Sequence, residues 1–181
     1  MSKIGRKPIK FSSAKVEIKD RQVSINGPKG KFTYEIPAVL QIRMEDNSIF
    51  LSPTKDTREN NAVWGLHRAL LANKIKGAEA GFEKTVKIVG LGYKAQPAGK
   101  KLNFSLGYSH KIEFALPEGV EVDVDKTGQQ LVFKSTDKLL LGNVCDKVRS
   151  LRPPEPYKGT GILVGDEVII RKAGKAKAAA G

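Results

Sequence analysis

The chain has 181 residues, of which 32 are Lys or Arg and 19 are Asp or Glu, so its formal net charge is +13. This charge is too high for a generic cytosolic domain, and the default partner is therefore nucleic acid. Its one cysteine, Cys145, excludes an intramolecular disulfide and a cysteine-based zinc site and fits a reducing compartment. No segment approaches the roughly 18 uncharged apolar residues of a membrane span, so we expect a soluble cytoplasmic protein with no membrane partner.

The first 15 residues carry five basic side chains and no acidic one. Gly5 and Pro8 oppose regular structure there, so we expect a basic arm at residues 1–15. The charge of this arm could face RNA or merely water. Its candidate RNA contacts are Lys3, Arg6 and Lys7.

Apolar and polar residues then alternate in several short segments, which predicts β-strands. These segments are 16–18, 23–25, 32–36, 40–44 and 49–51. A helix is predicted from Asp56 or Thr57 to about Lys76, with Gly77 as its stop. Its buried stripe would consist of Val63, Leu66, Ala69 and Leu70. Together these elements form a first domain at residues 16–80.

The second half repeats this order of elements. Apolar residues alternate with polar ones on both sides of a turn at residues 107–110, and the same pattern occurs about 80 residues upstream. In both halves, two further strand patterns and a helix follow. The second helix has Leu141, Val144, Cys145, Val148 and Leu151 at helical spacing. We therefore predict an α+β fold of two tandem similar units, each an antiparallel sheet packed with one helix, with the second domain at residues 81–170.

The second helix can be capped by Thr136 or Asp137 and ends at Pro153 and Pro154. The loop that follows, residues 152–162, has three prolines that limit its backbone freedom, so it loses less entropy on binding. Tyr157 could stack on an exposed base or sugar, or it could simply pack on its own domain. The candidate phosphate contacts of this region are Arg149, Arg152 and Lys158.

Charges of opposite sign are separated along the second half. Residues 84–111 contain six bases and no acid, whereas residues 113–125 contain five acids and no base. A polyanion would then approach the helix end and tail and avoid the acidic strands. Alternatively, the acids balance local lysines and protect a sheet edge from aggregation. Lys94 and His110 are two further candidate RNA contacts in the basic stretch.

The last segment, residues 171–181, has four bases, no acid and no large apolar group, so it cannot pack a core by itself. We expect a basic tail that either binds RNA or stays solvated. Its candidate RNA contacts are Arg171, Lys172, Lys175 and Lys177.

No residue pattern supports catalysis or a cofactor. His67 and His110 belong to different predicted units, and a zinc or iron site needs more ligands than these two. Cys145 lies on an apolar helix stripe, where thiols are usually inert. The glycines at 90 and 92 lack the third glycine and the following helix of a dinucleotide-binding fingerprint. The sequence therefore predicts no enzyme, no metal, no cofactor and no small-molecule substrate.

The segment PEPYKGTGI, residues 154–162, resembles PEPYKGKGI, a signature of the bacterial large-subunit ribosomal protein L6 family. The resemblance extends over nearly the whole chain. It includes MSKIGRKPI, GPKGKF, GLHRALLANKIKG, GFEKTVKIVGLGYKA, LNFSLGYSHKIEF and STDKLLLGNVCDKVRSLR. Thr160 stands where this family usually has Lys, which weakens any carry-over of a phosphate contact to that position.

The resemblance implies two similar α+β domains bound to 23S rRNA near the stalk base. There the second domain would lie beside the sarcin-ricin loop, next to neighbouring large-subunit ribosomal proteins. The role would be architectural, in the cytoplasmic ribosome and without a reaction. The competing hypothesis is a general cationic adaptor that binds acidic proteins or any nucleic acid without recognising shape.

Overall fold

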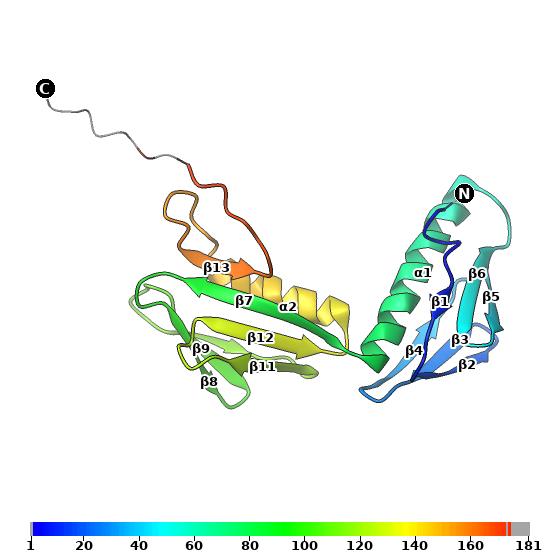
Figure 1. Ribbon diagram of the computed structural model, residues 1–181, viewed down its shortest axis with the longest axis horizontal. Coiled ribbons are helices and arrows are strands. Elements are labelled where there is room, and N and C mark those ends of the chain that lie inside the picture. Colours follow the sequence, from blue (N-terminus) through cyan, green and yellow to red (C-terminus); the bar gives the residue numbers. More distant parts are fainter. Residues whose placement is uncertain (1, 173, 175–181) are drawn as a thin grey trace, which may run out of the picture. The chain divides into compact units, whose positions relative to one another are not determined.

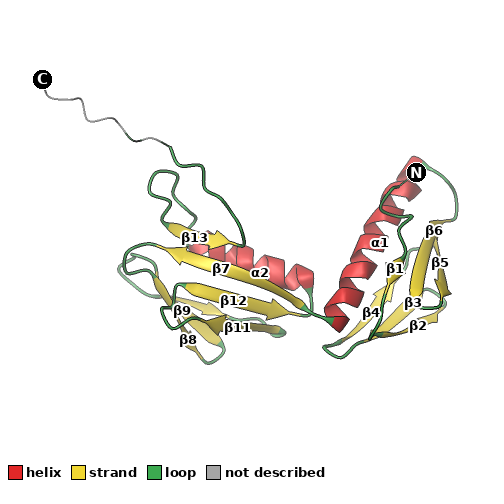
Figure 2. Cartoon of the chain, in the orientation of Figure 1, coloured by secondary structure: helices red, strands yellow, loops and turns green. Residues whose placement is uncertain are grey.

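The computed structural model describes residues 2–172 and 174, and the chain divides into two compact units (Figure 1). The first unit comprises residues 1–82 and the short segment 136–138, and the second comprises residues 83–135 and 139–181. Each unit combines antiparallel strands with one α-helix (Figure 2). The predicted α+β fold of two similar units is confirmed.

The first unit has two three-stranded antiparallel sheets and a long helix. One sheet has the order β2-β3-β4, with β2 at Lys15–Lys19, β3 at Gln22–Asn26 and β4 at Lys31–Glu35. The other has the order β1-β6-β5, with β1 at Ile9–Lys10, β5 at Leu40–Glu45 and β6 at Ser48–Pro53. The helix α1, Arg58–Glu79, lies against β3, β4 and β6 and closes the core (Figure 1).

The N-terminal segment is part of this core and does not form a detached arm. Ile9, Phe11 and Ala14 are buried with the apolar residues of the sheets and α1. The backbone N–H groups of Ser12 and Ser13 donate to Glu79 Oε1 at 2.7 and 2.8 Å. The apolar residues between the basic ones therefore decide where this segment lies, although its net charge suggested an arm.

The start of α1 follows the sequence prediction, but its end and its buried face do not. The Thr57 side chain caps the helix by accepting from the N–H of Asn60 at 3.2 Å. The helix continues past Gly77 to Glu79. Gly77 is buried there because a Cβ at this position would collide with the carbonyl oxygen of Thr136, so the glycine serves close packing.

The predicted buried stripe of α1 is wrong at two positions. Leu66 is 55% exposed and Leu70 is 40% exposed, while Val63 and Ala69 are half-buried. The face turned to the sheets carries Trp64, Leu71, Ile75 and Ala78 instead. Apolar residues occur on both sides of this helix, so periodicity alone allows either face to be buried. The close fit of Trp64 beside Gly5 helps to fix the choice.

The second unit repeats the arrangement of the first. The sheet β8-β9-β10 corresponds to β2-β3-β4, with β8 at Lys94–Ala98, β9 at Lys101–Ser105 and β10 at Ile112–Ala115. The other sheet has the order β11-β12-β7-β13, with β7 at Phe82–Val89, β11 at Val120–Val124, β12 at Gln130–Ser135 and β13 at Gly161–Val164. Here β11 and β12 match β5 and β6, β7 takes the place of β1, and β13 is an addition at the edge.

The helix of the second unit, α2 at Lys138–Leu151, buries the predicted stripe. Leu141, Val144, Cys145 and Val148 are buried, and Leu151 is half-buried. Burial raises the pKa of the Cys145 thiol against a smaller opposite effect of Lys84, so the thiol stays protonated and unreactive. Within the part of the chain that the structure describes, no helix has the length and apolar character needed to cross a membrane.

Candidate nucleic-acid interface

Three loops meet at the end of the second unit where β7 and α2 finish (Figure 1). They are residues 90–93 after β7, residues 106–111 between β9 and β10, and residues 152–160 after α2. A Cβ at Gly107 would lie 2.8 Å from the ring of Tyr93, so the first two loops are in close contact. The Tyr108 hydroxyl donates to the carbonyl oxygen of Leu151 at 3.2 Å, which fixes the second loop to the end of α2.

Arg152, Tyr108 and His110 form a row of planar side chains at this end. The Arg152 guanidinium lies 4.9 Å from the centre of the Tyr108 ring. The rings of Tyr108 and His110 are stacked, with centroids 6.1 Å apart and planes inclined by 25°. Contact with Tyr108 and, to a lesser degree, with Tyr93 raises the pKa of Arg152, so the guanidinium remains charged. The row therefore combines a fixed cation with two aromatic rings.

The segment after α2 is a closed turn held by its own hydrogen bonds. The N–H of Glu155 donates to the carbonyl oxygen of Thr160 at 2.9 Å. The N–H of Gly159 donates to the carbonyl oxygen of Glu155, also at 2.9 Å. The Thr160 hydroxyl also donates to Glu155 Oε2 at 3.3 Å. Tyr157, 55% exposed, and the exposed Lys158 lie at the tip of this turn. Thr160 thus stabilises the turn at the position where a lysine is usual.

The start of the tail lies along this turn. The N–H of Lys172 donates to the carbonyl oxygen of Pro156 at 2.9 Å. A Cβ at Gly159 would lie 3.1 Å from Nε of Arg171, so the arginine side chain covers that glycine. Arg171 and Lys172 are both exposed and add their charges to that of Lys158. The turn and the first tail residues therefore make one basic surface.

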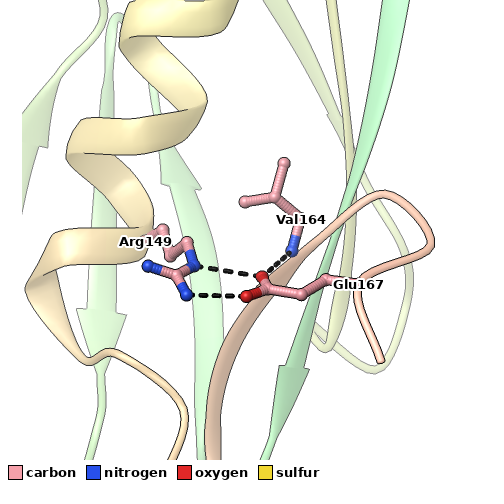
Figure 3. A network of polar contacts seen from close by, with 3 residues as sticks. All are labelled: Arg149, Val164 and Glu167. Atoms are coloured by element: carbon pink, nitrogen blue, oxygen red, sulfur yellow. Dashed lines mark hydrogen bonds and ion pairs between the residues drawn. The ribbon is translucent and has the colours of Figure 1, made fainter. Parts of the chain in front are cut away.

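Arg149 binds a carboxylate of its own unit (Figure 3). Its Nε donates to Glu167 Oε2 at 3.0 Å and its Nη2 donates to Glu167 Oε1 at 2.6 Å. Arg149 is the main cause that lowers the pKa of Glu167, whose Oε2 also accepts from the N–H of Val164 at 3.5 Å. The pair borders a hollow of about 360 Å³ that Lys84 and Asp146 also line. Arg149 therefore fixes the segment after β13 to α2.

The structure brings some of the sequence-predicted RNA contacts together and separates others. Arg152, His110, Lys158, Arg171 and Lys172 come from the three loops and the start of the tail, and Lys94 is exposed directly after the first loop. Lys3, Arg6 and Lys7 belong to the first unit, where the Lys7 carbonyl oxygen accepts from Arg68 Nε at 3.0 Å. Lys175 and Lys177 lie outside the described residues.

The RNA contacts predicted from the sequence do not include Leu91, Tyr93 and Tyr108, which belong to the first two loops. Leu91 is entirely exposed at the tip of the first loop, and Tyr108 is 43% exposed. The signal that could have found them is the pattern of their two turns, GLGY and GYSH, in which glycine precedes an aromatic residue. Gly90 and Gly107 leave room for the Tyr93 ring, because a Cβ at either position would lie within 2.8 Å of it.

Two of the acids in the acidic stretch form ion pairs with neighbouring lysines. Lys134 binds Asp123 at 2.7 Å and Lys101 binds Glu113 at 3.0 Å, each across adjacent strands. These pairs favour the interpretation that the acids balance local charge. Among residues 2–172 and 174, no three His, Cys, Asp or Glu side chains lie close enough together to hold a metal ion.

Comparison with known proteins gives consistent matches along the chain. The model of the family described as ribosomal protein L6 matches residues 12–81 and 89–165. The large ribosomal subunit protein uL6 of Syntrophomonas wolfei is 45% identical over 177 residues, which cover 97% of this chain and 98% of that protein. The protein of the same name from Burkholderia thailandensis is 41% identical over 177 residues, covering 98% and 100%.

Proposed function

The chain belongs to the ribosomal protein L6 family, and we propose that it is a structural constituent of the large ribosomal subunit that binds 23S rRNA. Its relatives carry the name large ribosomal subunit protein. The binding site would lie near the stalk base and the sarcin-ricin loop, beside other large-subunit proteins, in the cytoplasmic ribosome. The role is architectural: the protein holds rRNA helices in place and catalyses no reaction.

The observation that carries this proposal is the basic surface at the loop end of the second unit. Arg152, Lys158, Arg171 and Lys172 come together there from segments held by hydrogen bonds. Fixed cations bind phosphates at a lower entropic cost than mobile ones, and they also recognise the spacing of phosphates in a folded RNA. Arg149 remains a predicted RNA contact, although two of its nitrogens already bind Glu167.

The first unit would supply a second, separate set of contacts. Its predicted residues are Lys3, Arg6 and Lys7, on a segment whose apolar neighbours are buried in the core. Ile9 and Phe11 are buried in the core, so they fix the backbone of the N-terminal segment. The lysines of this segment are therefore attached to a backbone of defined position. Two folded units that each bind RNA can hold two rRNA helices in relation to one another, which is the architectural role proposed here.

A direct test compares two double variants of the full-length protein. Lys158→Ala with Lys172→Ala removes two charges from the basic surface, and the control pair Lys19→Ala with Arg43→Ala removes two exposed charges from β2 and β5 of the first unit, outside the predicted RNA contacts. The first pair should lower affinity for a large-subunit rRNA fragment and reduce the slope of log affinity against log salt by about two. Equal effects of the two pairs would support the general cationic adaptor instead.

Sedimentation gives the second readout. The wild-type protein should sediment with large ribosomal subunits and dissociate only in high salt, because many phosphate contacts are lost together. A protein that binds random RNA of the same length equally well once charge is screened would not be a specific rRNA-binding protein.

A further inference from the structure

The row formed by Arg152, Tyr108 and His110 has properties that phosphate binding does not require. A lysine or a mobile arginine suffices for a phosphate, whereas here the guanidinium lies over an aromatic ring at 4.9 Å and a second ring is stacked on the first. Tyr108 and His110 are exposed, so the row ends in solvent at the imidazole. Such a row offers a flat surface that one more planar group can extend.

The row is held in place before any ligand arrives. The Tyr108 hydroxyl is bound to the Leu151 carbonyl oxygen at 3.2 Å. Tyr93 packs against Gly90 and Gly107, at positions where a Cβ would lie 2.5 and 2.8 Å from its ring. A flat group that stacks on this surface therefore loses its own freedom but orders little of the protein, which favours binding.

Neighbouring residues favour a nucleotide as the planar group. Leu91, entirely exposed on the adjoining loop, offers an apolar contact for a base or sugar. Lys94 follows the first loop and Lys111 is the last residue of the second, and no acid occurs between residues 84 and 111, so these two loops attract phosphate. Bases inside an A-form helix have both faces covered by their neighbours, so the base must be an unpaired one.

We propose that the Arg152–Tyr108–His110 row is a platform on which one unpaired nucleobase of RNA stacks. This inference rests on the proposed function, since it assigns a nucleotide conformation to the same surface. It distinguishes two roles within that surface: Lys158, Arg171 and Lys172 bind phosphates, and the row recognises a base that has left its helix.

The test measures preference for an unpaired base with two RNA hairpins of identical stem. One hairpin carries a single bulged 2-aminopurine and the other has no bulge. The full-length wild-type protein should prefer the bulged hairpin and quench its fluorescence, because stacking quenches 2-aminopurine. Tyr108→Leu and His110→Ala should lower this preference roughly tenfold and abolish the quenching, while affinity for the plain hairpin changes little.

Arg152→Lys separates stacking from charge, because it keeps the positive charge and removes the planar guanidinium. It should lose preference for the bulge but retain affinity for the plain hairpin. Lys147→Ala is the matched control, because it removes an exposed charge of α2 outside the row and should leave the preference unchanged. His110→Ala changes an exposed residue, so it remains informative if Tyr108→Leu fails to fold.

Unchanged preference in all three variants, or a wild-type protein that does not prefer the bulge, would overturn the platform. Binding of the wild type to the rRNA fragment in the same assays would then leave the proposed function standing. Variants that weaken association with large subunits but keep their preference for the bulge would assign the row to a protein contact, which also overturns it. Loss of wild-type binding to the rRNA fragment with retained bulge preference would count against the proposed function alone.

Discussion

Glu79 connects the N-terminal segment to the end of α1 through one carboxylate oxygen. Glu79 Oε1 accepts from the N–H groups of Ser12, Ser13 and Ala14 at 2.7, 2.8 and 3.1 Å. Burial by itself raises the pKa of this carboxyl, but the three backbone donors and the Ser13 side chain together outweigh it, so the pKa lies below the ordinary value of 4.5. A negative charge at the end of a helix is otherwise unfavourable, and the donors offset that cost.

Glu79→Ala should destabilise the protein by about 1–3 kcal/mol, because three backbone donors lose a charged acceptor. The free energy of unfolding, measured with urea at neutral pH, checks this value. Glu35→Ala is the matched control, because it removes one carboxylate from an exposed position of β4. Equal effects of the two substitutions would contradict the role assigned to Glu79.

The same contact predicts a pH dependence. The pKa of Glu79 is lower in the folded than in the unfolded protein, so its contribution is complete above about pH 4.5 and is lost as the pH falls through the folded pKa. The difference in unfolding free energy between wild type and Glu79→Ala should therefore shrink in acid. A difference that grows as the pH falls would mean that the carboxylate is not the acceptor.

The environments of some single residues can be predicted from the sequence, and those of others cannot. Cys145 was predicted to be buried because its neighbours on the helix, Val144 and Val148, are apolar, and this local pattern was sufficient. Arg149 was predicted to bind phosphate, yet its partner Glu167 lies 18 residues along the chain. This ion pair forms only because the segment after β13 packs beside α2. A local sequence pattern does not predict that packing.

Two helical glycines, Gly77 in α1 and Gly142 in α2, look equivalent in sequence and differ in the structure. A Cβ at Gly142 would meet no atom within 4 Å, whereas a Cβ at Gly77 would collide with the Thr136 carbonyl oxygen. Glycine is a poor helix former in both places because its unfolded state is unusually flexible. Gly77 therefore serves close packing, whereas no packing contact in the structure requires a glycine at position 142.

Gly142→Ala should stabilise the protein by about 0.5–1 kcal/mol, since it gains helix propensity without a clash. Gly77→Ala should destabilise it by about 1–3 kcal/mol, because the added methyl group forces the backbone apart. Urea unfolding of both variants tests the pair, and each serves as the control for the other. Changes of the same sign would show that local propensity, not packing, governs both sites.

The elements themselves were predictable to different degrees. Strands β2 to β6 follow from alternating residues such as Val23 and Ile25, because one face of each sheet is buried. The buried face of α1 was predicted wrongly, because Leu66 and Leu70 suggested the face that remains exposed. Trp64 and Leu71 define the other face, and only contact with the sheets distinguishes the two.

At the scale of the whole molecule, the net charge of +13 predicts strongly salt-dependent binding. If about six phosphates are neutralised, affinity for the rRNA fragment should fall on the order of a thousandfold between roughly 50 and 200 mM salt. Fluorescence anisotropy with labelled RNA measures this slope, and an uncharged nucleoside is the control ligand. A flat response would exclude phosphate binding as the main source of affinity.

The internal repeat was also predictable, because both units use the same order of turns and apolar residues. Ile25 pairs with Phe32 in the first unit, and Phe104 pairs with Ile112 at the corresponding place in the second. The candidate site was less predictable. Its charged members follow from composition, whereas the row of Tyr108, His110 and Arg152 depends on two loops and a helix end that meet in space.

The chain has one tryptophan and one cysteine, and they fall in different units. Trp64 is buried in the core of the first unit, and Cys145 is buried in the core of the second. Indole fluorescence can therefore follow the melting of one half, while the rate of thiol labelling by an aromatic disulfide follows the opening of the other. The wild-type sequence thus carries one reporter in each half, which allows the cooperativity of the two halves to be measured without substituting any residue.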